Sequence, residues 1–311
     1  MTIYENGLGA NQANYAPLTP VDFLERAATT WPKKVAIIHG DIRRTYLEFK
    51  SRCRQMASAL ERRGIRKGDV VGIIAPNTPA MLEAHYGVVM AGAVLNALNY
   101  RLDPAAIAFI LDHGGAKILF VDKEFSSVIE QAVSLMDKPP VLIGIDDHLF
   151  PDGTVVGETE YEDFLTEGDP EYQWPKVIDE WDSMALNYTS GTTGNPKGVV
   201  FHHRGAFLNA MGNAIAFGLD SSSSYLWTLP MFHCNGWTFT WAVTAVGGTH
   251  VCLRSVDPAL IFDLIGQHKV SHMCGAPIVL NMLLHAPDGD KKQFEHLVQI
   301  ATGGAAPPSA V

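Results

Sequence analysis

The stretch from Thr189 to Gly198 carries the side chains of a polyphosphate-binding loop. It reads Thr-Ser-Gly-Thr-Thr-Gly-Asn-Pro-Lys-Gly and holds four hydroxyl groups, three glycines and one lysine within ten positions. Glycines let a backbone approach a ligand closely and turn its N–H groups inward, hydroxyls donate short hydrogen bonds, and lysine supplies a positive charge. We therefore predict that this stretch binds the phosphates of a nucleotide.

The flanks of this stretch distinguish it from an ordinary polar linker. Clusters of Gly, Ser, Thr and Asn are commonly flexible loops, but residues 184–188 and 199–201 have the apolar, β-branched pattern of strands entering and leaving a turn. The stretch is not a Walker A loop, because Pro196 precedes Lys197 and Gly198 occupies the position of the metal-binding hydroxyl. A strand rather than a helix follows, so the loop must hold phosphate with its own groups.

Two later segments carry further candidate residues. His233 and Trp237 stand four positions apart at the start of an apolar stretch, which is commonly core packing, but Asn235 and Gly236 between them favour an irregular segment at a cavity. Residues 303–306, Gly-Gly-Ala-Ala, follow an apolar strand. Such a turn is ordinary by itself, yet its backbone could lie flat against an aromatic ring.

In this order, the three segments resemble the signature motifs of the AMP-forming adenylating superfamily, and specifically its short- and medium-chain acyl-CoA synthetases. The resemblance implies catalytic roles for Thr189, Lys197 and His233, with His233 positioning the substrate rather than acting as a base. It implies a contact between Thr189 and Mg²⁺. The implied ATP phosphate-binding residues are Thr189, Ser190, Gly191, Thr192, Thr193, Gly194 and Lys197; the acyl-binding residues are His233, Cys234, Asn235, Gly236 and Trp237; the adenine-binding residues are Gly303, Gly304, Ala305 and Ala306.

The implied function is ATP-dependent ligation of a short- to medium-chain fatty or related carboxylic acid to CoA, through an acyl-AMP intermediate and release of pyrophosphate. Its small-molecule partners would be the acid, ATP and CoA, with Mg²⁺ as cofactor. Two alternatives stay open: an adenylating domain that loads a carrier protein, and a truncated nucleotide-binding product without turnover. The segment Phe-His-Cys-Asn-Gly-Trp favours CoA over a carrier protein.

Composition excludes several other classes of function. The chain has 311 residues, 47% of them hydrophobic and 18% charged, which is typical of a globular protein. A formal charge of −10 argues against a nucleic-acid partner. The four cysteines are widely spaced, which is typical of a reducing compartment. The sequence shows neither a secretory signal nor an apolar run long enough for a membrane span, so we expect a cytoplasmic protein; the family includes both monomers and homodimers.

The elements that must position these motifs alternate between helical and strand patterns. We predict an α/β fold with doubly wound, mostly parallel sheets and flanking helices, in two subdomains of a large N-terminal domain like that of acyl-CoA synthetases. The first subdomain would span residues 1–180 and end in a surface connection over 146–182 with one short helix. The second would span 181–311 and carry the motifs. Because residues 307–311 read as the start of a helix, we expect the front part of a longer protein, truncated at its C-terminus.

Overall fold

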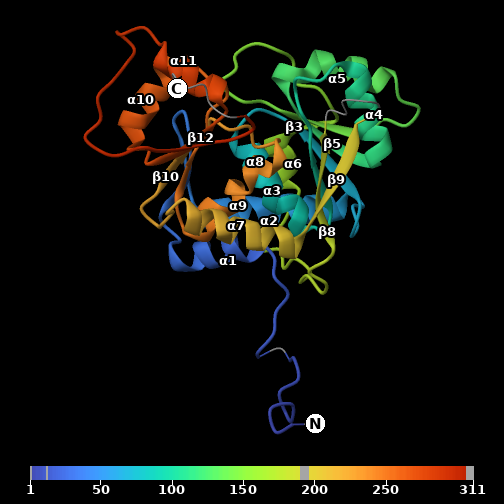
Figure 1. Ribbon diagram of the computed structural model, residues 1–311. Coiled ribbons are helices and arrows are strands. Elements are labelled where there is room, and N and C mark those ends of the chain that lie inside the picture. Colours follow the sequence, from blue (N-terminus) through green and yellow to red (C-terminus); the bar gives the residue numbers. More distant parts are fainter. Residues whose placement is uncertain (1, 12, 190–195, 306–311) are drawn as a thin grey trace.

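The computed structural model describes residues 2–11, 13–189 and 196–305 and contains two sheets with helices between and outside them (Figure 1). The mixed, mostly parallel α/β architecture predicted from the sequence is confirmed. In spatial order, the seven-stranded sheet consists of β7 (Thr159–Glu160), β6 (Val141–Ile145), β5 (Ala116–Asp122), β3 (Val70–Ile74), β4 (Val94–Ala97), β8 (Ser183–Thr189) and β9 (Lys197–His202). The six-stranded sheet consists of β13 (Gln299–Thr302), β12 (His272–Gly275), β10 (Ser224–Leu226), β11 (Thr249–Val251), β1 (Val35–His39) and β2 (Ile42–Thr45).

The neighbouring strands of each sheet are parallel except at one edge. There a hairpin adds an antiparallel strand, β9 beside β8 in one sheet and β2 beside β1 in the other. Both sheets draw strands from both sides of the expected boundary near residue 180: β1 and β2 lie in the sheet of β10–β13, and β8 and β9 complete the sheet of β3–β7. The two predicted subdomains therefore do not correspond to the two sheets.

The helices form three layers around three apolar clusters. The largest cluster lies between the sheets, the second lies under α4 and α5 on the outer face of the seven-stranded sheet, and the third lies under α10 on the outer face of the other sheet. Helices of the central layer are α1 (Val21–Thr30), α2 (Tyr46–Arg62), α3 (Pro79–Met90), α6 (Tyr161–Thr166), α7 (His203–Ala216) and α9 (Phe239–Ala245). Outer helices are α4 (Pro104–Gly114), α5 (Ser126–Ser134), α10 (Pro258–His268) and α11 (Pro277–Leu284).

Helix starts follow from local sequence. Three helices begin with proline after an oxygen-bearing cap: Thr78 before α3, Asp103 before α4 and Asp257 before α10, each accepting a hydrogen bond from a backbone N–H of the first turn. Proline fits this position because the first-turn N–H groups have no partner within the helix. The cap and the proline together explain why these boundaries are readable from sequence.

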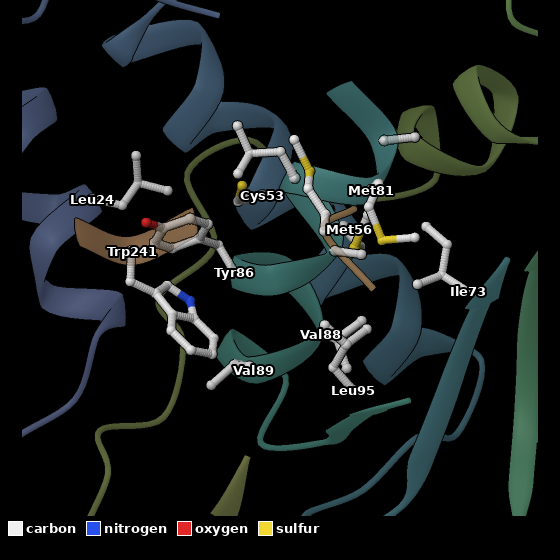
Figure 2. Close-up of a cluster of buried hydrophobic side chains, with 14 of the residues drawn as sticks. Leu24, Cys53, Met56, Ile73, Met81, Tyr86, Val88, Val89, Leu95 and Trp241 are labelled. Carbon is white, nitrogen blue, oxygen red and sulfur yellow. The ribbon is translucent and has the colours of Figure 1, made fainter. Parts of the chain in front are cut away.

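Helix α3 lies at the centre of the molecule, and all twelve of its residues are buried. Figure 2 shows Met81, Tyr86 and Val88 of α3 among side chains from α1, α2, β3 and α9. The same helix buries Glu83 completely, where its carboxylate accepts hydrogen bonds from Arg44 (2.6 Å), Arg52 (2.7 Å) and the Tyr161 hydroxyl (2.6 Å). These bonds join α3 to β2, α2 and α6, and we call them the Glu83 network.

The expected surface connection over residues 146–182 is partly a core segment. It contributes β7 to the edge of the seven-stranded sheet, and Tyr161, Phe164 and Leu165 of α6 are buried in the central cluster. The prediction of one short helix near residues 161–165 is confirmed as α6. The apolar face of α6 has only three side chains and is surrounded by acidic and turn-forming residues. It is therefore too short to show a helical period in the sequence.

Candidate active site

The predicted phosphate loop joins two antiparallel strands. Thr189, the last residue of β8, lies opposite Lys197, the first residue of β9, and the pairing continues down to Ser183 opposite His202. Thr189 and Lys197 are both exposed at this end of the hairpin. Ser190, Gly191, Thr192, Thr193 and Gly194 lie outside the described residues, so their assignment to phosphate binding stays a prediction.

A cavity of about 310 Å³ opens beside this hairpin, where β8 faces β4. The two strands are paired through Leu95 and Ala185, and the cavity begins beyond that pair, at their carboxyl ends. This is the edge at which α/β sheets bind ligands. Residues that line it from β8 and its loop include Asn187, Tyr188, Thr189 and Pro196, and the opposite wall includes Phe232, His233 and Cys234.

The structure thus brings two of the three predicted motifs to one cavity. Thr189 and His233 are 44 positions apart in sequence, yet both line it. No Asp, Glu, Lys or Arg is among the described residues that line it. An anionic carboxylate would therefore meet hydroxyl, amide and imidazole groups there without a like charge to repel it.

The segment after His233 has an unusual backbone. Five consecutive residues, Cys234 to Thr238, have positive φ angles of 48°, 53°, 59°, 52° and 65°, and only the third is glycine. The left-handed conformation costs roughly 1–2 kcal/mol for each residue other than glycine, with asparagine a partial exception. We call this segment the left-handed turn. The expected irregular segment is present, and helix α9 begins directly after it, at Phe239.

Side-chain amides of other elements hold this turn. Asn213 of α7 donates to the Trp237 carbonyl oxygen (2.7 Å) and to the Thr238 hydroxyl (3.0 Å). From β8, Asn187 donates to the Phe232 carbonyl oxygen (3.1 Å) and accepts from the Asn235 side chain (2.9 Å). Such outliers persist only where surrounding bonds fix them, and they cluster at functional sites.

A second cavity, of about 530 Å³, lies on the other side of the turn. Trp237, Thr238, Phe217 and Phe239 line it, and it shares Cys234 and Phe201 with the first cavity. Burial raises the pKa of the Cys234 thiol, so the thiol is neutral at physiological pH. The turn therefore forms a common wall of two cavities. We call the one beside the phosphate hairpin the polar cavity, after Asn187, Thr189 and His233, and the second one the aromatic cavity, after Phe217, Trp237 and Phe239.

The third motif reaches this aromatic cavity through Trp237. A Cβ atom on Gly303 would lie 2.4 Å from the Trp237 ring, so the indole packs directly on the backbone that follows β13. Gly304 has φ +84°, which favours glycine, and the described part of the motif continues to Ala305. Ala306 lies outside the described residues. The adenine-binding assignment of this motif stays a prediction, since the observed contact is with Trp237.

Sequence reasoning did not identify the asparagines that hold the turn. Asn209 and Asn213 stand on a regular helix and Asn187 on a regular strand, and no local pattern marks them. Asn96 is a further buried residue at the first cavity, and its amide has no hydrogen-bond partner within the described part of the chain. The available signal was Asn235 followed by Gly236, because both residues tolerate positive φ.

Neither a metal cluster nor a membrane helix is found in the part of the chain that the structure describes. No group of three His, Cys, Asp or Glu side chains there could hold a metal ion. Of the helices within residues 2–11, 13–189 and 196–305, none combines the length and apolar character needed to cross a bilayer.

The chain is similar to known proteins in both sequence and structure. The chain is 47% identical to the peroxisomal acetate/butyrate–CoA ligase of Arabidopsis thaliana, over 96% of this chain and 55% of that protein. It is 46% identical to an acetate–CoA ligase of Humulus lupulus, over 98% of this chain and 56% of that protein. The inhibitor-bound N-terminal domain of FACL13 from Mycobacterium tuberculosis superposes with a TM-score of 0.82 at 27% identity, covering 94% of this chain and 71% of that one.

The chain thus spans little more than half the length of these curated relatives. The model of one protein family, described as AMP-binding enzyme, matches residues 24–311, which include all three motifs. The chain therefore belongs to the family of AMP-binding enzymes.

Proposed function

We propose that the full-length protein is an ATP-dependent carboxylic acid–CoA ligase and that this chain supplies its nucleotide- and acid-binding portion. In the first step a carboxylate oxygen attacks the α-phosphorus of ATP, the bond to the β-phosphate oxygen breaks, and acyl-AMP and pyrophosphate form. In the second step the CoA thiol loses its proton and attacks the acyl carbon, which releases AMP. The observation that carries the proposal is that Thr189 and His233 line the same cavity.

We propose a separate part of this chemistry for each motif. Thr189 and Lys197 are the strand pair next to the loop of the hairpin. There they would donate to the β- and γ-phosphates and offset charge on the departing pyrophosphate. His233 lies across the cavity, where it would orient the carboxylate. The aromatic cavity at Trp237 would take the acyl chain. Mg²⁺ would be held by phosphate oxygens with the Thr189 hydroxyl, and it would neutralise phosphate charge.

The acid that we propose is short- to medium-chain. The aromatic cavity measures about 530 Å³, and Phe217 and Phe239 form part of its wall. The similar Arabidopsis protein is named for acetate and butyrate. CoA is preferred to a carrier protein as acceptor because both similar plant proteins are named CoA ligases. Incubating the full-length enzyme with acid, ATP and either CoA or a phosphopantetheinyl protein would show which acceptor forms the thioester.

Acid-dependent exchange of labelled pyrophosphate into ATP tests the adenylation step in the full-length enzyme. We expect exchange with butyrate, and we expect Lys197→Ala and Thr189→Ala each to lower its rate by about 10²–10³, as for other lost transition-state donors. Lys291→Ala is the matched control, because Lys291 is exposed and pairs with Asp288 away from both cavities. Equal rates for Lys197→Ala and the control would contradict the proposal.

Three further properties belong to the proposal. We propose that residues 1–311 alone have very weak or no ligase activity, because the chain covers about 55% of its relatives' length; robust acyl-CoA formation by the purified chain would contradict this. We propose a homodimer, which light scattering would measure. We propose that the protein is cytoplasmic, because its four cysteines are free thiols. A similar protein is named as peroxisomal, so imaging of a fluorescent fusion would distinguish the two compartments.

A further inference from the structure

The left-handed turn lies between the two cavities, and the residues near its two ends line different ones. Cys234 lines both of them, whereas His233 lines the polar cavity and Trp237 the aromatic one. Four of its five residues are not glycine and have positive φ. Because a right-handed or extended backbone would point these side chains elsewhere, the shape of the turn determines where the histidine and the tryptophan stand.

The far end of the turn is tied to α7. Asn213 donates to the Trp237 carbonyl oxygen and the Thr238 hydroxyl, and that hydroxyl donates to Asn209 one helical turn away (3.1 Å). From α9, the Thr240 hydroxyl donates to the Asn235 carbonyl oxygen (3.1 Å). These bonds fix Trp237 and leave the His233 end to be fixed by another element.

That element is β8. Asn187 donates to the carbonyl oxygen of Phe232, the residue before His233, and accepts from Asn235, two residues after it. Both amides are buried, with exposed fractions of 7% for Asn187 and 0% for Asn235. One side chain therefore brackets His233 on both sides along the chain.

Asn187 also lies two residues before Thr189 on the same strand. Side chains at alternate positions of a strand lie on the same face of the sheet, and both residues line the polar cavity. The strand that ends in the phosphate loop thus carries the amide that holds His233. Any shift of the hairpin would move this amide, and any shift of the amide would move the imidazole.

We infer that Asn187 is a positioning residue, which fixes the distance between Thr189 and the carboxylate-orienting His233 through its paired bonds to Phe232 and Asn235. The inference rests on the proposed function and deepens it. Adenylation needs the carboxylate oxygen and the α-phosphorus in contact and aligned, and a misplacement of about 1 Å can lower a rate about a hundredfold. Asn187 touches neither reactant in this role.

The test compares three variants of the full-length enzyme in pyrophosphate exchange. Asn187→Ala removes both bonds, and Asn235→Gly removes one bond while keeping a residue that adopts positive φ without strain. We expect Asn187→Ala to lower kcat about ten- to a hundredfold with KM for ATP changed less than about threefold. In the double variant we expect nearly the kcat of Asn187→Ala alone, since the two side chains act through one link.

Thr244→Val is the matched control. It removes the buried hydrogen bond from Thr244 of α9 to His250 of β11 (3.0 Å) and should lower the melting temperature without lowering kcat. A second readout is the rate at which an aromatic disulfide reagent labels Cys234, the exposed cysteine among four. Loosening of the turn in Asn187→Ala and Asn235→Gly should raise that rate several-fold, whereas Thr244→Val should leave it unchanged.

The outcomes separate this inference from the proposed function. Absence of exchange in the wild-type enzyme would refute the function, and the labelling rates would still report whether Asn187 holds the turn. An active wild type with kcat of Asn187→Ala within twofold would overturn the inference. So would a kcat loss in Thr244→Val equal to that in Asn187→Ala, because it would reduce the effect to stability. If Asn187→Ala does not fold, an unchanged labelling rate in Asn235→Gly overturns the inference, and a raised rate supports it.

Discussion

Two polar networks of this protein use opposite chemistry. The Glu83 network joins α3 to β2, α2 and α6 through a carboxylate, two guanidinium groups and a phenol. The network around the left-handed turn consists of neutral amides and hydroxyls from β8 and α7. Charged groups leave a large penalty when one partner is lost, whereas neutral amides leave a smaller one. The first network should therefore govern stability and the second the geometry of the site.

The largest expected effect breaks the charged network. Glu83→Gln would leave Arg44 and Arg52 beside a neutral amide, and removing one partner of a buried ion pair costs about 3–5 kcal/mol. Burial acts to raise the pKa of Glu83, but Arg44 and Arg52 outweigh it and hold the pKa below its ordinary value. We expect urea unfolding to show this loss in stability while KM for ATP stays within about twofold. A variant as stable as the wild type would contradict the comparison.

The next effect concerns pH and the histidine beside the turn. His85 of α3 donates from Nδ1 to the Met81 carbonyl oxygen (2.8 Å), and its ring packs on Trp241 with centroids 5.8 Å apart. Burial lowers the pKa of His85 to about 4. Because the unfolded chain binds this proton near pH 6.5 and the folded chain near 4, the stabilising contribution is complete above pH 6.5 and decreases as pH falls between these values.

The expected slope for His85 is about 1.4 kcal/mol per pH unit in that range. His85→Asn keeps a donor for Met81 and does not titrate, so its stability should depend less on pH between 6 and 4.5 than that of the wild type. Urea unfolding at four pH values measures both slopes. Since the carboxylate of Glu83 loses its contribution only as pH falls below the ordinary glutamate value near 4.3, the histidine should respond first; identical slopes would refute this order.

A smaller effect concerns the contact between Trp237 and the third motif. Gly303→Ala would place a methyl group 2.4 Å from the indole, so the ring or the backbone must shift. Overpacking of this kind costs about 1–3 kcal/mol, and we expect KM for the acid to rise by about tenfold. Gly289→Ala is the control, because nothing lies within 4 Å of its added Cβ and its φ is not positive. Equal KM values for the two variants would show that Trp237 does not shape the acyl cavity.

The phosphate hairpin and the order of strands in the sheets differ in how far they could be predicted from sequence. The hairpin around the phosphate loop was predicted because strand patterns on both flanks are local. The pairing of β1 with β11 joins residues more than 200 positions apart. No local pattern specifies such a partner, so the sequence did not predict which sheet β1 and β2 join.

The left-handed turn was only partly predictable for a related reason. Asn235 and Gly236 indicated an irregular segment, but Cys234, Trp237 and Thr238 do not favour positive φ by themselves. Their conformation depends on bonds from Asn187 and Asn213, which come from a strand and a helix elsewhere in the chain. The residues that we propose to bind substrate belong to a sequence motif, whereas the residues that hold them in place belong to none.

The smallest expected effect is a gain in stability at the helix that carries half of the turn's support. Gly212 lies in α7 between Asn209 and Asn213, is exposed, and has nothing within 4 Å of an added Cβ. Alanine inside a helix is more stable than glycine by about 0.5–1 kcal/mol. Gly212→Ala should raise the free energy of unfolding, measured in urea, by that amount. It should leave kcat for adenylation within about twofold, because the asparagines keep their positions. A loss of kcat despite the gain in stability would show that α7 must flex for the turn to function, and the neutral network would then be a moving part rather than a fixed support.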